Sequence, residues 1–479
     1  MRRGFILAIV LLLGALALSA CNNNNNASSG GGGSQSNAGG GGGNPLVIAW
    51  AQWQPASELQ ELCADFTNET HIPVKVEQIP WPQYQDKIYN AWSAKSDTYD
   101  LIVGDSQWLG LGATQGHYVE LTDWAKTNIK LDEMSPAALS EYGEYPAGSK
   151  RYYALPCESD GIGFAYRRDL FDDPTEKANF KAKYGYDLAP PKTWKELRDI
   201  AEFFTRPDKN LYGAGLFYSK DYDGITMGFD QVLWCYGGEL HDASGKVEGV
   251  LNSPMAVDAL KFYCQDLKKF TPPGSESYYF DQTMDAYGRG QVAMAEEWFA
   301  FMPGFIDPNG KNKNYLDKTD YFVSPAGPAG HYISLGGQGI SISAYSKRQD
   351  DAKKFLAWFE SADVQQKWAQ KGGLTANKAV LASPQFLSYA PYNKTFAESQ
   401  KYFRDFYNNP EYADLLNACQ QHFNAVASGT EQPKQALDAL AAEHTTILQK
   451  AGDLKASYRA QPDVLARRME TVSRRHARP

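Results

Sequence analysis

The first part of the globular sequence switches between strand-like and helical patterns of apolar residues. A short apolar run at 46–50 precedes a helical pattern at 57–68, and a strand-like pattern follows at 74–79. A polar helical segment at 84–93 then leads to the apolar run 100–103, which is typical of a buried parallel strand. This order of elements predicts an α/β fold, in which ligands bind at the carboxyl ends of strands.

A second series of helical patterns follows. Thr193 and Glu196 stand at the spacing of a capping box, which predicts that a helix begins between them. Further helices are predicted at 253–270, 350–370 and 432–450. The pattern then fades, and we expect the Arg-rich C-terminal tail, 453–479, to be a solvated terminus.

The chain begins with the pattern of an export signal. Arg2 and Arg3 precede the apolar run 5–18, which is shorter than the roughly 20 residues that a membrane-spanning helix needs. We therefore expect residues 1–20 to be a signal peptide that is removed. The run ends in Leu-Ser-Ala-Cys, which resembles a lipobox, so Cys21 is the expected site of lipidation. An ordinary signal peptide followed by a chance cysteine is the alternative.

The segment that follows the signal has an unusual composition. After Cys21, residues up to Asn44 are only Asn, Gly, Ser, Ala and Gln, which bury no apolar surface. Such a sequence is typical of a flexible linker, so we predict a tether over residues 21–44. The expected product is an exported protein, anchored by lipid to a bacterial membrane and facing the periplasm or the cell exterior.

Composition narrows the class of partner. The chain has 479 residues, 43% of them hydrophobic, and a net charge of -9, which suits two ordinary domains. No stripe of Lys and Arg is present to neutralise phosphates, so nucleic acid is not an expected partner. Five cysteines besides Cys21 are widely spaced, without a CxxC motif. We expect buried thiols with at most one disulfide, no zinc site and no cofactor.

Six blocks of sequence together carry a resemblance to a known family. They are, in chain order, 100–106, 153–170, 190–197, 287–298, 335–339 and 352–356. In this order they resemble the large extracellular solute-binding proteins of bacterial ABC importers, family 1, which are similar to maltose-binding protein. The resemblance covers roughly residues 47–450.

The resemblance implies a two-lobed periplasmic-binding-protein fold of type II, with hinge strands between the lobes and a ligand cleft between them. The N-terminal lobe would hold residues 45–157 plus about 320–372, and the C-terminal lobe 158–319 plus about 373–452. It also implies a monomer that is not an enzyme and that delivers a solute to the transmembrane subunits of an ABC permease. The chain has no GxxxxGK[ST] loop of its own, so separate ATPase subunits would supply the energy.

Sugar recognition requires flat aromatic faces and planar polar groups. The first set of candidates comprises Trp53, Gln54, Asp105, Ser106, Trp108 and Asp160. The second set comprises Asp221 with its loop neighbours Tyr222 and Asp223, Trp234, Glu297 and Trp298. Gly336 and Gly337 with Gln338 would allow close approach of the backbone. The resemblance places a ligand-binding carboxylate at Asp160. An aromatic residue beside an apolar run is often part of a core instead, which is the alternative for Trp108 and Trp234.

The candidate residues favour a neutral carbohydrate, which could be an oligosaccharide, a disaccharide or a polyol. They include several carboxylates and almost no Lys or Arg, whereas a phosphate would favour Arg or a helix N-terminus. A polyamine or a glycerol phosphate is the alternative ligand.

Two classes of enzyme share single features with this sequence. The Gly-Asp-Ser sequence at 104–106 is similar to an esterase block, but no histidine has the Asp three residues before it that this chemistry uses. A secreted glycoside hydrolase is a remote alternative, because paired carboxylates and Trp platforms are also its tools.

Overall fold

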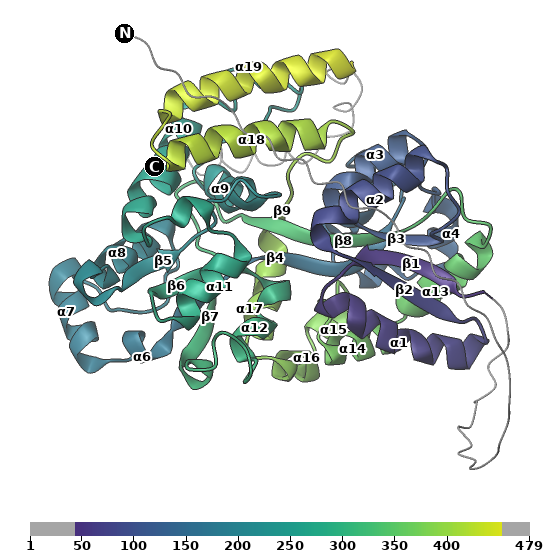
Figure 1. The fold of residues 1–479 in the computed structure, drawn as a ribbon, viewed down its shortest axis with the longest axis horizontal. Coiled ribbons are helices and arrows are strands. Elements are labelled where there is room, and N and C mark those ends of the chain that lie inside the picture. The colour runs from purple at the N-terminus through teal and green to yellow at the C-terminus, as the bar shows by residue number, and fades with distance from the viewer. Residues whose placement is uncertain (1–43, 453–479) are drawn as a thin grey trace, which may run out of the picture. The chain divides into compact units, whose positions relative to one another are not determined.

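A mixed sheet forms the centre of the structure, a computed structural model that describes residues 44–452 (Figure 1). The strand order is β2-β1-β3-β8-β4-β6-β5, with β7 paired to β4 and β9 paired to β8. The strands are β1 (Leu46–Ala51), β2 (Val74–Ile79), β3 (Leu101–Asp105), β4 (Leu155–Arg167), β5 (Tyr212–Gly215), β6 (Val292–Trp298), β7 (Thr319–Val323), β8 (Ile333–Ile342) and β9 (Phe403–Arg404).

Helices cover both faces of this sheet (Figure 1). Those of the first half of the chain are α1 (Gln54–Thr70), α2 (Trp81–Ser93), α3 (Leu109–Thr114), α4 (Thr122–Asn128), α5 (Pro136–Gly143), α6 (Arg168–Phe171), α7 (Pro174–Tyr184), α8 (Trp194–Phe204) and α9 (Gly224–Cys235). Those that follow are α10 (Pro254–Lys261), α11 (Phe280–Gly288), α12 (Pro303–Ile306), α13 (Gln349–Phe359), α14 (Ala362–Lys371), α15 (Lys378–Leu381), α16 (Pro384–Tyr389), α17 (Asn393–Ser399), α18 (Tyr412–Ala427) and α19 (Pro433–Ala451).

The opening β-α-β-α-β pattern is confirmed. Strand β1 pairs in parallel with both β2 and β3, and every residue of β3 is buried. Burial on both faces explains why this strand is a continuous apolar run instead of an alternating one. The carboxyl ends of β1 and β3 therefore lie at the same edge of the sheet, where Trp53 and Asp105 emerge.

Strands β4 and β8 join the two lobes. The first part of β4, residues 155–161, pairs with β8, while its second part, residues 162–167, pairs with β6 and β7. One thirteen-residue strand, buried throughout, thus belongs to both halves of the fold. This is the two-lobed α/β architecture expected from the sequence. The residue boundaries of the two lobes stay a prediction, because the described residues form one compact unit.

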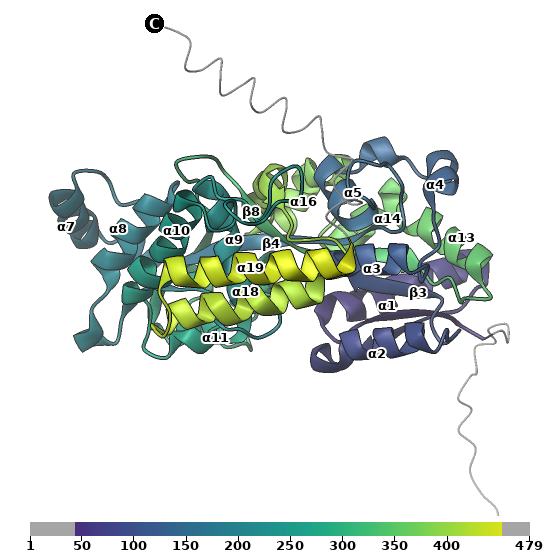
Figure 2. The ribbon, with the colours of Figure 1, turned by 90° about the horizontal axis from the view of Figure 1, so that it is seen from above.

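Two of the later helices follow the sequence pattern closely. In α8 the side chain of Thr193 accepts a hydrogen bond from the backbone N–H of Glu196 at 3.2 Å, and the Glu196 carboxylate accepts one from the backbone of Thr193 at 3.2 Å. The predicted capping box is therefore confirmed. The helix expected at 432–450 is α19, which lies beside α18 in both views of the ribbon (Figure 2).

Two other predicted helices differ from the structure. The helix expected at 253–270 is α-helical only as far as Lys261, and then continues as a π turn and a 3-10 turn. The helix expected at 350–370 is two helices, α13 and α14, because Ser361 is extended between them. The Ser361 hydroxyl donates to the carbonyl of Trp358 at 2.7 Å, which is the local competition that favours a helix boundary at serine.

The five cysteines among the described residues are all free and buried, so the possible disulfide is not present there. Burial raises the pKa of each thiol above its usual value. The expectation of buried small hydrophobic residues is confirmed for these five residues: Cys63, Cys157, Cys235, Cys264 and Cys419.

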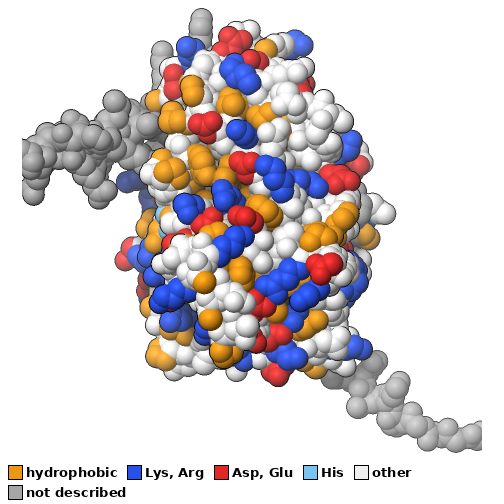
Figure 3. All heavy atoms as spheres, turned by 90° about the vertical axis from the view of Figure 1, so that its left-hand side faces the viewer, with side chains coloured by type: hydrophobic (Ala, Val, Ile, Leu, Met, Phe, Trp, Pro, Cys, Tyr) orange, Lys and Arg blue, Asp and Glu red, His pale blue; other side chains and the backbone are white. Residues whose placement is uncertain are grey.

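The predicted signal peptide, Cys21, nearly all of the predicted linker and the C-terminal tail lie outside the described residues. Within residues 44–452, none of the helices has the length and apolarity that crossing a membrane requires. The surface at the α7 and α8 end carries basic and acidic side chains interspersed with each other, as Figure 3 shows. This face therefore presents no continuous field of one sign.

Candidate functional site

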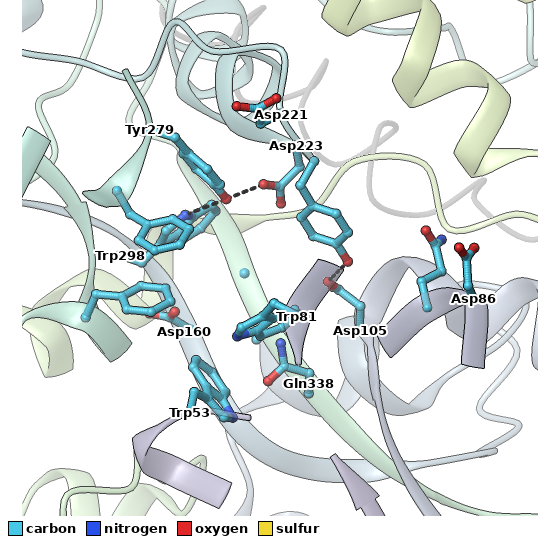
Figure 4. Close-up of a pocket in the computed structure, with 16 residues that line it drawn as sticks. Trp53, Trp81, Asp86, Asp105, Asp160, Asp221, Asp223, Tyr279, Trp298 and Gln338 are labelled. Atoms are coloured by element: carbon cyan, nitrogen blue, oxygen red, sulfur yellow. Dashed lines mark hydrogen bonds between the residues drawn. The ribbon is translucent and has the colours of Figure 1, made fainter. Parts of the chain in front are cut away.

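A cavity of about 580 Å³ opens where the two halves of the sheet meet (Figure 4). Its volume is in the usual range for a small-molecule site. It is lined by Trp53, Trp81, Gln85, Asp86, Asp105, Asp160, Asp221, Tyr222, Asp223, Tyr279, Phe280, Trp298, Phe301, Gly336, Gly337 and Gln338. The lining thus combines aromatic rings with carboxylates.

Aromatic rings from both lobes surround the cavity. Trp53 and Trp81, at the first turns of α1 and α2, meet edge to face with ring centroids 5.4 Å apart. Trp298 ends β6 and is only 4% exposed, and its indole N–H donates to the Tyr279 hydroxyl at 3.1 Å. Figure 4 shows Trp53, Trp81 and Trp298 around a common centre. The three rings offer flat apolar faces to a ligand.

Asp105 connects the two lobes at one side of the cavity. It is the last residue of β3, and its carboxylate accepts a hydrogen bond from the Tyr222 hydroxyl at 2.6 Å. Tyr222 comes from the loop before α9 in the other lobe and has a positive φ of 50°. Burial raises the pKa of Asp105 to about 6, although the hydrogen bond from Tyr222 acts in the opposite direction.

Two further carboxylates lie deeper in the cavity. Asp160 lies on the shared strand β4 and accepts hydrogen bonds from the backbone N–H groups of Gly161 at 2.7 Å and Ala300 at 3.1 Å. Asp223 accepts a hydrogen bond from the Tyr279 hydroxyl. Burial, together with a smaller effect of the neighbouring carboxylates, raises the pKa of each carboxyl to about 7.

A glycine pair in β8 brings the backbone to the cavity wall. Gly337 has a φ of +91°, and a Cβ there would lie 2.3 Å from the Glu158 carbonyl oxygen on the paired strand β4. At Gly336 a Cβ would lie 2.7 Å from the ring of Trp298, so the missing side chain lets the indole pack flat. The next residue, Gln338, is 4% exposed, and its side-chain oxygen has no hydrogen-bond partner within residues 44–452.

The structure brings most of the sequence-predicted site residues together. Those that line the cavity are Trp53, Asp105, Asp160, Asp221, Trp298, Gly337 and Gln338. Those that lie outside its lining are Gln54, Ser106, Trp108, Trp234 and Glu297. Their role in ligand binding, for both groups, stays a prediction.

The two tryptophans outside the lining belong to the core. Trp108 is buried, with Tyr84 and Tyr89 at centroid distances of 5.2 and 5.8 Å. Trp234 lies on α9, whose residues are all buried, and the Arg404 guanidinium stands 4.7 Å above its ring. Both follow the alternative that an aromatic residue next to apolar neighbours packs inside.

The three polar residues outside the lining each have a hydrogen-bond partner within the protein. Glu297 precedes Trp298 on β6, and the two side chains point to opposite faces because successive residues of a strand alternate. The Glu297 carboxylate accepts a hydrogen bond from the Thr283 hydroxyl at 3.1 Å. Ser106 donates to the neighbouring carboxylate of Asp105 at 3.4 Å. Gln54 is exposed and donates to Glu58 at 2.7 Å on the surface of α1.

Several lining residues were not among the predicted ones. Trp81 follows β2 just as Trp53 follows β1, so the rule that selected Trp53 would also have found it. Tyr222, Asp223 and Gly336, in contrast, belong to the loop of Asp221 and to the glycine pair that the sequence already indicates. The others carry no local signal that distinguishes them from ordinary aromatic and polar residues: Gln85, Asp86, Tyr279, Phe280 and Phe301.

The ligand-free protein is expected to be more stable at pH 5.5 than at pH 7.5. The folded pKa values of Asp105, Asp160 and Asp223 lie at about 6 to 7, above the unfolded value near 4, so the folded state binds more protons in this range. Stability then falls as pH rises, and these shifts predict a difference of about 4 kcal/mol. Urea unfolding at the two pH values measures it.

Asp223→Asn supplies the control for this pH effect, because the amide cannot ionise. The slope of stability against pH should become smaller in this variant, whereas Asp132→Asn, on an exposed turn, should keep it. A wild-type protein that is more stable at pH 7.5 would contradict the assignment of raised pKa values to the cavity.

Comparison with known proteins adds an independent finding. Residues 27–366 match the family model of the bacterial extracellular solute-binding protein. A probable amino-acid ABC transporter periplasmic-binding protein of Sinorhizobium fredii is 22% identical over 82% of this chain and 86% of its own length. The mannitol-binding protein of Pseudomonas aeruginosa is 24% identical over 52% of this chain and 55% of its own length.

A solved structure shares the fold. An ABC transporter solute-binding protein of Agrobacterium radiobacter, in complex with ribitol, superimposes with a TM-score of 0.71 and 26% identity. The match covers 84% of this chain and all of that one. Within residues 44–452, no group of three or more His, Cys, Asp or Glu side chains is arranged to hold a metal ion.

Proposed function

Because the chain belongs to the bacterial extracellular solute-binding proteins, we propose that it captures a sugar or polyol for an ABC importer. The ligand is held between the two lobes and is then delivered to the transmembrane subunits of the permease. The similar proteins described above include one named for mannitol and one bound to ribitol, which supports this ligand class. The family is one of binding proteins, and the proposal includes no catalytic step.

The observation that carries the proposal is the combination of rings and carboxylates in one cavity. Trp53, Trp81 and Trp298 supply faces on which the C–H surfaces of a sugar can stack. Asp105 and Asp160 supply planar acceptors for hydroxyl groups. Within this proposal, the predicted residues that line the cavity bind the ligand directly.

Contacts between the lobes support capture by closure around the ligand. Tyr222 reaches across the cavity to Asp105, and Tyr412, at the start of α18, contacts Gln85 and Tyr89 on α2. The Tyr412 and Tyr89 hydroxyl groups lie 2.8 Å apart. These contacts lie outside the strands β4 and β8 that join the lobes, so they can form and break as the lobes move about those strands.

The proposal extends to the place of action. Cys21 carries the lipid that anchors the monomer to the membrane, and residues 22–44 let the folded part reach solute and permease. Mass spectrometry of the protein purified from its native membrane tests this step. A diacylated cysteine at the mature N-terminus supports the anchor, and a free N-terminus elsewhere contradicts it.

Thermal denaturation with a ligand panel tests the proposed function. The panel contains mono- and disaccharides, oligosaccharides and polyols, with glycerol phosphate and spermidine as the alternative classes. A ligand at 100 times its Kd stabilises the fold by about 2.7 kcal/mol, which gives a clear rise in Tm. A response only to the phosphate or the polyamine contradicts the carbohydrate proposal, and release of labelled products from an oligosaccharide would indicate a hydrolase instead.

A further inference from the structure

The hydrogen-bonding groups of the cavity are unbalanced. Five aspartates line it, Asp86, Asp105, Asp160, Asp221 and Asp223, and among the described residues of the lining none is Lys, Arg or His. A neutral sugar hydroxyl both donates and accepts, so a site for neutral hydroxyls alone needs donors as well as acceptors. The lining supplies many more hydrogen-bond acceptors than donors.

The donors of the lining are largely engaged by the protein itself. The Tyr222 hydroxyl donates to Asp105, and the Tyr279 hydroxyl donates to Asp223. The Trp298 N–H donates to Tyr279. The indole N–H groups of Trp53 and Trp81 are buried and have no partner within the described residues, so the donors left for a ligand in this part of the site are these two and the side-chain amide of Gln338.

A buried acceptor, the side-chain oxygen of Gln338, is a second indication that the ligand carries a hydrogen-bond donor. Gln338 is 4% exposed and lines the cavity, and its side-chain oxygen has no hydrogen-bond partner in the described residues. Figure 4 shows this side chain directed toward the same space as Trp53 and Trp81. A buried acceptor without a partner costs about 1 to 3 kcal/mol, so a ligand group that donates to it is favoured.

We propose that the ligand is an amino sugar or an amino polyol, whose protonated amine lies among Asp105, Asp160 and Asp223. This inference rests on the proposed function and narrows its ligand class. An ammonium group has three donors and no acceptor, which matches the surplus of acceptors. Its charge compensates buried carboxylates that have no cationic partner in the lining, and the faces of Trp81 and Trp298 stabilise a cation further.

The groups around the three carboxylates determine the pH dependence. Asp86 and Asp221 line the same cavity as the three aspartates. The carboxyls of Glu158 and Glu297 interact electrostatically with Asp160, and that of Asp405 with Asp105, although these three do not line the cavity. The hydroxyl groups that act on them belong to Tyr84, Tyr89, Tyr118, Tyr142, Tyr222, Tyr279 and Tyr412. None of these groups is a cation, so deprotonation of the three aspartates is not offset locally.

The sign of the effect follows from these charges. The pKa is about 6 for Asp105 and about 7 for Asp160 and Asp223, so all three lose protons between pH 5.5 and pH 7.5. The amine of an amino polyol such as 1-amino-1-deoxysorbitol stays protonated over this range, so its affinity should rise with pH by about tenfold. The ammonium of glucosamine is more acidic because of its neighbouring oxygen atoms, so its affinity should rise less. A neutral polyol that accepts from protonated carboxyls should instead bind more weakly as pH rises.

Isothermal titration of the purified full-length protein tests the inference with matched ligands. The pairs are 1-amino-1-deoxysorbitol with sorbitol, and glucosamine with glucose and N-acetylglucosamine. We expect at least one amine to bind about tenfold more tightly at pH 7.5 than its hydroxyl and acetylated counterparts. Asp223→Asn should reduce the preference for the amine over its hydroxyl counterpart to about threefold or less, and Asp105→Asn is the second variant if the first does not fold.

The outcomes that contradict this inference also show whether the proposed function fails with it. If the hydroxyl compound binds as tightly as the amine, the cationic ligand is wrong while the carbohydrate-binding function stands. If spermidine binds and no sugar or polyol does, or if no compound binds, the proposed function fails as well. Asp132→Asn, on the surface, is the charge-matched control and should keep the wild-type preference for the amine.

Discussion

Replacing Trp298 with alanine is expected to weaken binding of the carbohydrate ligand by about 30-fold or more, a loss of about 2 kcal/mol. The indole is almost fully buried at the end of β6 and forms one wall of the cavity. Alanine removes the stacking face and leaves space for water. It also removes the N–H donor of the Tyr279 hydroxyl, which positions Asp223.

Isothermal titration with the best ligand of the panel measures this effect. Trp298→Phe keeps an aromatic face without the N–H, so it should lose less affinity than alanine. Trp124→Ala, on α4 and outside the cavity lining, is the control for the loss of a tryptophan and should bind normally. A folded Trp298→Ala protein with unchanged affinity would remove this residue from the site.

Gly337→Ala is expected to destabilise the fold by about 3 kcal/mol or more. At a φ of +91° an L-residue is strained by about 1 to 2 kcal/mol, and the new Cβ would lie 2.3 Å from the Glu158 carbonyl oxygen. Relief of that contact must separate β8 from β4, which are the strands shared by the two lobes. The added cost of forcing an atom into a packed site is about 1 to 3 kcal/mol.

Gly116→Ala separates the effect of backbone strain from that of the steric contact. Gly116 also has a positive φ, +72°, but a Cβ there would meet nothing within 4 Å. It should therefore lose only about 1 kcal/mol from backbone strain. Urea unfolding compares the two variants, and equal losses would contradict a steric role for the close approach at Gly337.

Much of the fold could be predicted because its signals are local. The apolar run that became β3, the helical spacing of α1 and the capping box of α8 each depend on neighbouring residues, and the structure contains all three. The predicted helix over 350–370 was wrong in one detail, since Ser361 interrupts an apolar pattern that continues through it. Periodicity alone does not distinguish a break of two residues from a continuous helix.

The candidate site could be predicted only in part, because side-chain direction depends on distant partners. Trp53 and Trp108 both follow a strand, yet Trp53 lines the cavity while Trp108 packs against Tyr84. Glu297 and Trp298 are adjacent, but only Trp298 lines the cavity, because the pleat of β6 directs the two side chains to opposite faces. Tyr279 and Phe301 reach the site through tertiary packing that no pattern in the sequence reports.

The order in which β8 joins the sheet also governs when the chain can fold. Strand β3 pairs with β8, and β8 is synthesised only after β4, β6 and β7. The first lobe therefore cannot complete its sheet while the ribosome is still making the second, and the long sequence separation makes this pairing slow. Until residue 342 has been made, β3 therefore keeps an unpaired edge, and the native sheet can close only after most of the chain has emerged from the ribosome.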